Sequence, residues 1–351
     1  MPEPLVPKTR IPWRHLLLYG WMPSALKVWA YRTFRHYTIG RGVRIAPGAV
    51  IIGDHVTLGD HVEIGFLVVV LGRNITIGRH SSIGTFSYLN CETIEIGEDA
   101  RIREQVYVGG PQLPESRFTL GSRTIVLQMT NINPTKPVTI GDDTGIGGHC
   151  LIFTHGAWLN VLDGYPVTYE PVTLGKSVWL PWRVFLMPGT TIGDGSVIGA
   201  NSLVSGTIPP SSLAVGSPAK VIRSAPDFPR AVTDAERAEL VEMMIFEFER
   251  YLTYFGVTVT KQAPYRTYTR LAKPWRLLWL RPSDPPEYPV LAGDTVLSEK
   301  PLTDARRAVY RDGGVHWLDL AGRTRSRSGS PLTEELAQFI SRYGIRLPRD
   351  G

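Results

Sequence analysis

Residues 174–205 decide the fold and read LGKSVWLPWRVFLMPGTTIGDGSVIGANSLVS. An aliphatic residue recurs at every sixth position of this stretch, and glycine follows it in several of the steps. The aliphatic series consists of Leu174, Leu180, Leu186, Ile192, Ile198 and Val204. A helix repeats about every 3.6 residues and a half-buried strand alternates, so neither produces this spacing. A hexapeptide period predicts a parallel β-helix, in which each hexad forms one flat side and one corner of a coil.

The hexapeptide repeat extends well beyond this stretch. It begins near Ile39, and we place the β-helix domain at residues 38–223. Two insertions interrupt it, at residues 110–117 and 156–171. The first contains two prolines and predicts a surface loop. The second is longer and rich in aromatic residues, and a loop of this length in a compact repeat is usually functional or disordered.

Composition and cysteine usage suggest the compartment. The two cysteines, Cys91 and Cys150, both fall inside hexads. We expect buried free thiols rather than a disulfide, which favours a reducing compartment. A short apolar run at residues 16–22 is broken by Pro23, and a spanning helix needs about 20 apolar residues. We therefore expect a cytoplasmic protein without a signal peptide, and we expect no nucleic-acid partner.

Residues 1–37 form a basic segment for which we predict an amphipathic helix. Six lysines and arginines stand against Glu3 alone, and six minus one gives +5 of the total net charge of +6. The segment is also rich in tryptophan and leucine, so it could make a peripheral contact with the inner, anionic face of a membrane. Alternatively it is a capping helix that packs on the first coil and turns its charges to water. We prefer the capping interpretation, because solenoids need atypical ends.

The sequence style changes after the repeat. We interpret residues 224–256 as a linker and a helix, which begins at a capping box of Thr233 and Glu236. We expect this helix to pack beside the β-helix. Residues 257–351 predict a small α+β domain whose role the sequence does not reveal. In this tail we expect two strand regions and one helix, at residues 276–280, 308–318 and 332–343.

Several segments near the end of the repeat carry a family pattern. They are Val178-Trp179-Leu180, Pro188–Gly193, Ile198–Ser202, Ile208-Pro209-Pro210 and Gly216–Arg223. From about residue 140 onward the chain resembles the hexapeptide-repeat acyltransferases, in the sugar O-acetyltransferase branch that includes the galactoside and maltose enzymes. The resemblance implies a left-handed β-helix and a homotrimer. It also implies that acetyl-CoA is the co-substrate and lies in grooves between subunits.

The resemblance assigns five residues to the cofactor. Ala200 and Ser205 match positions that meet the pantetheine arm, and Trp179 matches a tryptophan beside the active site. Lys220 and Arg223 match basic positions near the phosphates, where cations pair with phosphate oxygens.

One departure from the family pattern affects this assignment. The family often has Val-Thr-Lys where this chain has Val-Ser-Gly at residues 204–206, so a lysine is missing there. That loss weakens the argument for phosphate binding at this coil. The alternative for Lys220 and Arg223 is a solvated end-cap without a ligand.

His155 is the candidate catalytic residue. It closes a hexad immediately before the second insertion, where the resembled enzymes carry a general base. An imidazole suits this role because its pKa lies near neutrality. Four other histidines occupy the same rank of their hexads, which we expect to face outward at a corner: His55, His61, His80 and His149. Asp163 or Glu170 in the loop could orient the His155 ring, and the sequence does not choose between them.

The same insertion supplies the candidate acceptor-binding residues. Trp158, Tyr165 and Tyr169 could stack on a sugar ring, although loop aromatics more often anchor the loop itself. We predict a CoA-dependent O-acetyltransferase that acts on a carbohydrate hydroxyl. N-acylation of an amino sugar is the alternative within the fold.

Two other classes share this architecture. The γ-type carbonic anhydrases hold zinc with three histidines, and their histidine pair is five residues apart and shares a face. Here His149 and His155 are one hexad apart, so we expect no metal. A non-catalytic scaffold is the last alternative, and the Gly-Ser-Pro-Ala-Lys ending at residues 216–220 argues against it.

Overall fold

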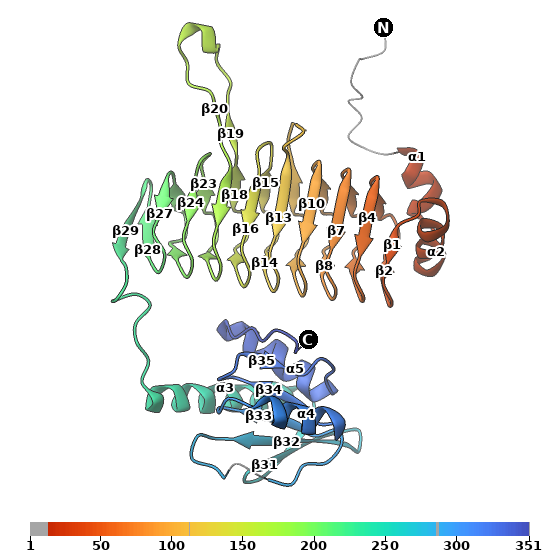
Figure 1. The fold of residues 1–351 in the computed structure, drawn as a ribbon, viewed down its shortest axis with the longest axis vertical. Coiled ribbons are helices and arrows are strands. Elements are labelled where there is room, and N and C mark those ends of the chain that lie inside the picture. The colour runs from red at the N-terminus through yellow and green to blue at the C-terminus, as the bar shows by residue number, and fades with distance from the viewer. Residues whose placement is uncertain (1–12, 112, 286–287, 351) are drawn as a thin grey trace. The chain divides into compact units, whose positions relative to one another are not determined.

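The computed structural model describes residues 13–111, 113–285 and 288–350. It divides into two compact units, Met1–Ala231 and Val232–Gly351. The first unit is a left-handed parallel β-helix with a helical segment at its N-terminal end (Figure 1). The second is a small α+β unit. This architecture confirms the fold class that the hexapeptide period predicts.

Each coil of the β-helix contributes one strand to each of three sheets, apart from the last coil, whose strands lie in sheets A and B. Successive coils pair in parallel, and only the last pair of sheet B is antiparallel. Sheet A contains β1 (Thr38–Ile39), β4 (His55–Leu58), β7 (Asn74–Ile77), β10 (Thr93–Ile96), β13 (Arg117–Leu120), β16 (Val138–Ile140), β21 (Val172–Leu174), β24 (Thr191–Ile192) and β27 (Thr207–Ile208). Sheet B contains β2 (Arg44–Ile45), β5 (Glu63–Ile64), β8 (Ser82–Ile83), β11 (Arg101–Ile102), β14 (Ile125–Val126), β17 (Gly145–Ile146), β22 (Trp179–Leu180), β25 (Val197–Ile198), β28 (Leu213–Gly216) and β29 (Ala219–Arg223). Sheet C contains β3 (Val50–Ile52), β6 (Val69–Leu71), β9 (Tyr88–Asn90), β12 (Tyr107–Gly109), β15 (Asn131–Asn133), β18 (Leu151–Phe153), β23 (Phe185–Leu186) and β26 (Leu203–Val204).

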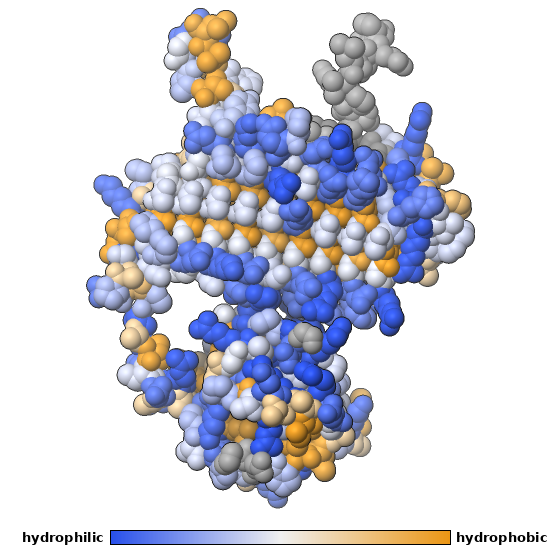
Figure 2. All heavy atoms as spheres, in the orientation of Figure 1, coloured by the Kyte–Doolittle hydropathy of each residue, from blue (hydrophilic) through white to orange (hydrophobic). Residues whose placement is uncertain are grey.

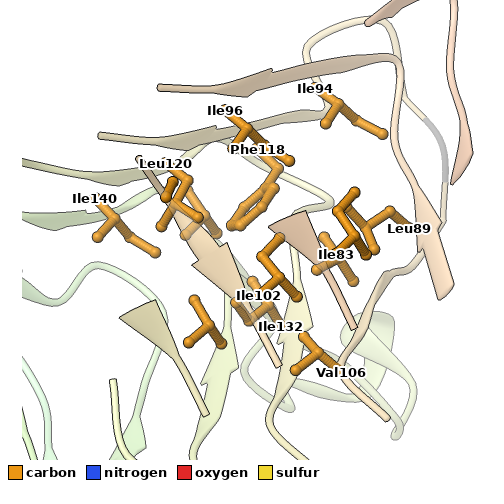
Figure 3. Close-up of a cluster of buried hydrophobic side chains, with 14 of the residues drawn as sticks. Ile83, Leu89, Ile94, Ile96, Ile102, Val106, Phe118, Leu120, Ile132 and Ile140 are labelled. Atoms are coloured by element: carbon orange, nitrogen blue, oxygen red, sulfur yellow. The ribbon is translucent and has the colours of Figure 1, made fainter. Parts of the chain in front are cut away.

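The aliphatic rank of the hexads forms the core. Its side chains are buried in every coil and stack on their equivalents above and below, as Figure 3 shows for the central coils. The glycine after this rank has a steric reason. A Cβ added at Gly141 would lie 2.6 Å from the carbonyl carbon of Gly175 in the next coil, which is too close for any side chain. Cys91 and Cys150 are buried and free, as expected, and burial raises the pKa of the Cys150 thiol to about 11.

The N-terminal segment covers the first coil. It consists of α1 (Trp13–His15), the π-helix η1 (Leu16–Gly20) and α2 (Ser24–Phe34). Tyr31 and Tyr37 enter the β-helix core from this segment. Its charges do not all face water, which corrects one expectation. The Lys27 side chain is 0% exposed, and its ammonium donates to three main-chain carbonyl groups.

Among its described residues, the second unit contains one mixed sheet and three α-helices. The strands follow chain order: β30 (Thr258–Gln262), β31 (Tyr265–Arg270), β32 (Lys273–Leu280), β33 (Thr295–Ser298), β34 (His316–Asp319) and β35 (Thr324–Arg325). The helices are α3 (Asp234–Tyr254), α4 (Asp304–Asp312) and α5 (Pro331–Ile340), and the short 3-10 turn η3 (Ser341–Tyr343) follows α5.

One expectation for this unit is partly wrong. In the strand region expected at residues 308–318, residues 308–312 belong to helix α4, whereas residues 316–319 do form strand β34. Thr303 caps α4 by accepting a hydrogen bond from the Arg306 main-chain N–H. Helix α3 begins at the predicted capping box and packs inside the second unit. Its buried side chains Met244 and Phe248 share a core with residues of β31, β32 and α5.

None of the helices among the described residues has the length and apolar character needed to cross a membrane.

Candidate functional site

His155 lies at the base of a two-stranded ribbon that leaves the β-helix. The chain exits sheet C after β18 and forms β19 (His155–Gly156), which pairs antiparallel with β20 (Thr168–Tyr169). Figure 1 shows this ribbon projecting from the β-helix. Thr154 fixes its base, because the buried hydroxyl donates to the Asn133 carbonyl at 2.7 Å and accepts from the Lys136 N–H at 3.0 Å. The inserted loop therefore starts from a rigid point.

One face of the His155 imidazole is in contact with another ring, and one of its nitrogens is buried. Its ring stacks on the Tyr169 ring, with 5.6 Å between centroids and 18° between planes. Its Nδ1 atom is buried and has no hydrogen-bond partner among the described residues. Buried polar atoms are nearly always paired in folded proteins. An unpaired ring nitrogen here is consistent with a partner that a ligand or a second chain supplies.

His155 is not equivalent to the other histidines of its hexad rank, which corrects the expectation of a shared corner position. His61, His80 and His149 do lie at corners, in the left-handed backbone conformation with φ of 57° to 58°. His55 instead begins strand β4, and His155 begins strand β19. Only His155 leads into the ribbon, because the insertion replaces the corner that would otherwise follow.

The two loop carboxylates do not orient the His155 ring within the described residues. Asp163 lies in the short 3-10 turn η2 (Val161–Asp163) and accepts a hydrogen bond from the Asn160 side chain at 2.9 Å. Glu170 lies against Gly189, where any Cβ would collide with its carboxylate. The orientation of His155 therefore comes from Tyr169 and from the ribbon.

The three candidate acceptor-binding aromatics do not form one cluster. Tyr169 contacts His155. Trp158 is 95% exposed, and Tyr165 is also exposed, on the far part of the ribbon around η2. The structure thus separates Trp158 and Tyr165 from the histidine. A role for them in binding requires a surface that this chain alone does not provide.

The candidate cofactor residues fall on two edges of sheet C. Ser205 follows β26, at the corner between sheets C and A, which is also the corner that His155 leaves two coils earlier. Ala200 follows β25, at the opposite corner between sheets B and C. A ligand that touches both edges must cross the outward face of sheet C or be shared with another copy.

The remaining cofactor candidates lie on sheet B. Trp179 covers Gly145 of the preceding coil, whose added Cβ would lie 2.6 Å from the indole Cε3. Lys220 and Arg223 are exposed on β29, which closes sheet B by pairing antiparallel with β28. These residues share the sheet B side with Ala200 rather than the His155 corner.

The sequence interpretation missed Trp182. This exposed side chain covers Gly148, whose added Cβ would lie 2.8 Å from the indole Cε3, and its ring lies 5.7 Å from that of His149. Its main-chain carbonyl accepts a hydrogen bond from the N–H of Asn201, the residue after Ala200. Trp182 therefore borders the cofactor candidates at the corner between sheets B and C. The sequence did contain a signal for this contact, namely the pair Gly147-Gly148 one coil before Trp182.

The outward faces of the sheets differ in chemistry. Sheet A presents a ladder of threonines that Glu95 interrupts between Thr76 and Thr119: Thr38, Thr57, Thr76, Thr119, Thr139, Thr173, Thr191 and Thr207. Sheet C instead presents mostly half-buried apolar side chains, with Asn90, Asn131 and Asn133 among them: Val69, Leu71, Tyr88, Tyr107, Leu151, Phe153, Phe185 and Leu203. Among the described residues, no group of three or more histidine, cysteine or acidic side chains is arranged to hold a metal ion.

Parts of the chain are similar to known proteins. The family "Hexapeptide repeat of succinyl-transferase" matches residues 184–208. The galactoside O-acetyltransferase of Escherichia coli K12 is 36% identical over 144 residues, which are 38% of this chain and 64% of that enzyme, slightly less than two thirds. A protein of the same strain, provisionally named colanic acid biosynthesis acetyltransferase WcaF, is 33% identical over 129 residues, which are 37% of this chain and 68% of the relative.

Solved structures also match the β-helix. One is a hexapeptide-repeat acetyltransferase from Vibrio cholerae O1 biovar eltor, crystallised with acetyl coenzyme A. It is 26% identical, covers 43% of this chain and 71% of its own, and has a TM-score of 0.31. The sequence relatives, together with the coils described above, show that the chain belongs to the hexapeptide-repeat acetyltransferase family.

Proposed function

We propose that the protein transfers an acetyl group from acetyl-CoA to a hydroxyl group of a carbohydrate, with His155 as the general base. Family membership supports acetyl transfer, and the named relatives act on galactosides or are assigned to colanic acid biosynthesis. The single observation that carries the catalytic assignment is the His155 ring. It is stacked on Tyr169, fixed at the base of an inserted ribbon, and holds a buried Nδ1 without a partner among the described residues.

The proposed reaction needs one proton acceptor and no change of oxidation state. A ring nitrogen of His155 takes the proton of the acceptor hydroxyl as its oxygen attacks the thioester carbonyl carbon. The C–S bond then breaks, and the CoA sulfur leaves with the proton that His155 returns. A positioned base of this kind typically contributes about 10² to 10⁴ in rate.

We further propose that the active unit is a homotrimer in which sheet C faces the neighbouring subunits. The outward face of sheet C is mostly apolar, whereas that of sheet A carries mainly threonines, and buried interface cores are more apolar than the remaining surface. Such a packing would also bring the His155 corner of one copy toward the opposite edge of another copy. That arrangement would join His155 and Ser205 with Ala200, Lys220 and Arg223.

The trimer and the activity are tested separately. Light scattering after gel filtration should give about three times the chain mass of 39.0 kDa. Replacing Leu151 and Phe185 with aspartate should lower that mass, because it places charges on the apolar face. The matched change of Thr139 and Thr173 to aspartate on sheet A should leave the mass unchanged. A monomeric wild-type protein at micromolar concentration would contradict the shared site.

The activity test uses acetyl-CoA with a panel of neutral and amino sugars, read by mass spectrometry. We expect a mass gain of one acetyl group on neutral sugars that have no amine. Acetylation confined to amino sugars, and stable to mild base, would replace the proposal with N-acylation. No acetyl transfer, together with no CoA binding, would favour a non-catalytic scaffold.

A further inference from the structure

The helical segment at the N-terminal end of the β-helix exposes an unusual set of large apolar side chains. In α1, η1, α2 and the short connection between η1 and α2, the exposed members are Trp13, Leu17, Leu18, Trp21, Leu26, Trp29 and Phe34. Single exposed apolar residues are ordinary, but contiguous groups mark interaction surfaces. Figure 2 shows hydrophobic side chains at this end of the β-helix. We call these seven residues the cap surface.

The cap surface cannot turn inward, because the opposite side of the same segment is fully used. Tyr31 is buried, and its hydroxyl accepts a hydrogen bond from the Ile51 N–H at 3.1 Å. Ser24 accepts from the Ile45 N–H at 2.9 Å. Lys27 is held by the carbonyl groups of the first coil. These contacts fix the rotation of α2, so Leu26 and Trp29 remain on its outer side.

The charge around the cap surface has one sign. Residues 4–53 contain no aspartate or glutamate, whereas residues 1–37 contain six lysines and arginines. Arg14 is exposed and follows Trp13 directly, and Arg32 and Arg35 lie at the C-terminal end of α2. Anionic surfaces are therefore attracted to this end of the β-helix.

The composition of the cap surface points to lipid. Three of its seven members are tryptophans, which prefer the boundary between headgroups and acyl chains. Leucines and phenylalanine supply the part that enters the apolar layer, and a basic surround supplies attraction to acidic headgroups.

We propose that the cap surface docks the protein on an anionic lipid bilayer as a peripheral contact. The helices lie on the surface and do not cross it, in agreement with the lack of a sufficiently long apolar helix among the described residues. This inference concerns the end of the β-helix away from the His155 ribbon and does not depend on the proposed chemistry.

Vesicle flotation of the full-length protein tests the proposal. Wild-type protein should float with vesicles of phosphatidylcholine and phosphatidylglycerol, and much less with phosphatidylcholine alone. Binding should fall as salt is raised, because the attraction between charges is screened. Leu17→Ser with Leu18→Ser removes two side chains that are 78% and 63% exposed, and it should weaken binding at least ~10-fold.

The chain offers a matched control. Leu271→Ser with Leu291→Ser makes the same chemical change at residues of the second unit that are 95% and 63% exposed. This variant should float like the wild type. Thermal melting of both variants should match that of the wild type, because none of the four leucines is buried.

Other outcomes would overturn the proposal. Equal flotation of the Leu17/Leu18 variant and the wild type would remove the cap surface from the contact. If the wild-type protein did not float with anionic vesicles, the proposed membrane contact itself would be excluded. A lower solution mass of the Leu17/Leu18 variant, without any lipid effect, would instead identify the cap surface as a contact between copies.

Discussion

The two ends of the β-helix are closed in different ways. At the N-terminal end, side chains satisfy the main chain of the first coil: Lys27 donates to the carbonyl groups of Gly20, Ala46 and Ala49 at 2.9 to 3.0 Å. At the C-terminal end, the β28–β29 hairpin closes sheet B by main-chain pairing. The difference matters because closure by main-chain pairing does not use the side chains of the closing strand. Lys220 and Arg223 are therefore exposed at the C-terminal end, whereas Lys27 is buried and hydrogen-bonded to the main chain.

This comparison predicts that the catalytic and cofactor-binding side chains lie in the C-terminal half of the β-helix. It also predicts that the lysine at the N-terminal end stabilises the fold. The sharpest test of the first part is His155→Ala. It should lower turnover by at least ~10² with little change in acetyl-CoA affinity, because only the proton acceptor is lost. Steady-state kinetics and CoA titration measure both quantities.

His149→Ala is the control for this variant, since His149 lies at a corner and leads into no ribbon. It should retain nearly full turnover. If His155→Ala were equally active, another residue would have to act as the base.

The second test exchanges the same residue type at the two ends. Lys27→Met should lower the free energy of unfolding by about 1–3 kcal/mol, because the carbonyl groups of Gly20, Ala46 and Ala49 lose the ammonium donor, and those of Gly20 and Ala46 keep only a main-chain N–H. Lys220→Met should change it by less than about 0.5 kcal/mol, because the side chain is exposed. Denaturant melts of both variants provide the measurement. Equal effects would show that the ends are not closed differently.

The third test uses pH. Burial lowers the pKa of Lys27 from 10.5 to about 8. Between these values the unfolded chain binds more protons than the folded chain, so the free energy of unfolding should rise with pH, by at most about 3 kcal/mol. Melts at pH 7 and pH 9.5 should show this gain in the wild type and lose it in Lys27→Met. An identical pH response of the two proteins would contradict it.

The smallest expected effect concerns the exposed basic side chains at the C-terminal end of the β-helix. Replacing Lys220 and Arg223 with alanine should weaken acetyl-CoA binding several-fold and change turnover less, because phosphates far from the thioester do not change during transfer. Binding should also become less sensitive to salt. Calorimetry at two ionic strengths tests both statements, and an unchanged affinity would return these residues to a solvated end-cap.

The sequence predicted the repeat closely because every coil repeats the same short pattern, which is a local feature of the chain. Each hexad meets the same neighbours one coil away, so the period alone identifies the buried rank from Ile39 to Val204. The capping box at Thr233 is also local, and it appears where the sequence placed it. His155 could be selected only because an insertion follows it.

What the sequence could not determine depends on contacts that the repeat pattern does not encode. We expected the lysine side chains of the N-terminal segment to face water. Lys27 is nevertheless buried, because carbonyl groups 19 and 22 residues away accept hydrogen bonds from its ammonium group. Residues 308–312 carry no period that excludes a strand, and the Thr303 cap decided for a helix. The placement of Ser205 and Ala200 on opposite edges of sheet C likewise follows from the winding of the coil. The hexapeptide period therefore determined the β-helix, whereas tertiary packing decided which charges are buried and which candidate residues share a corner.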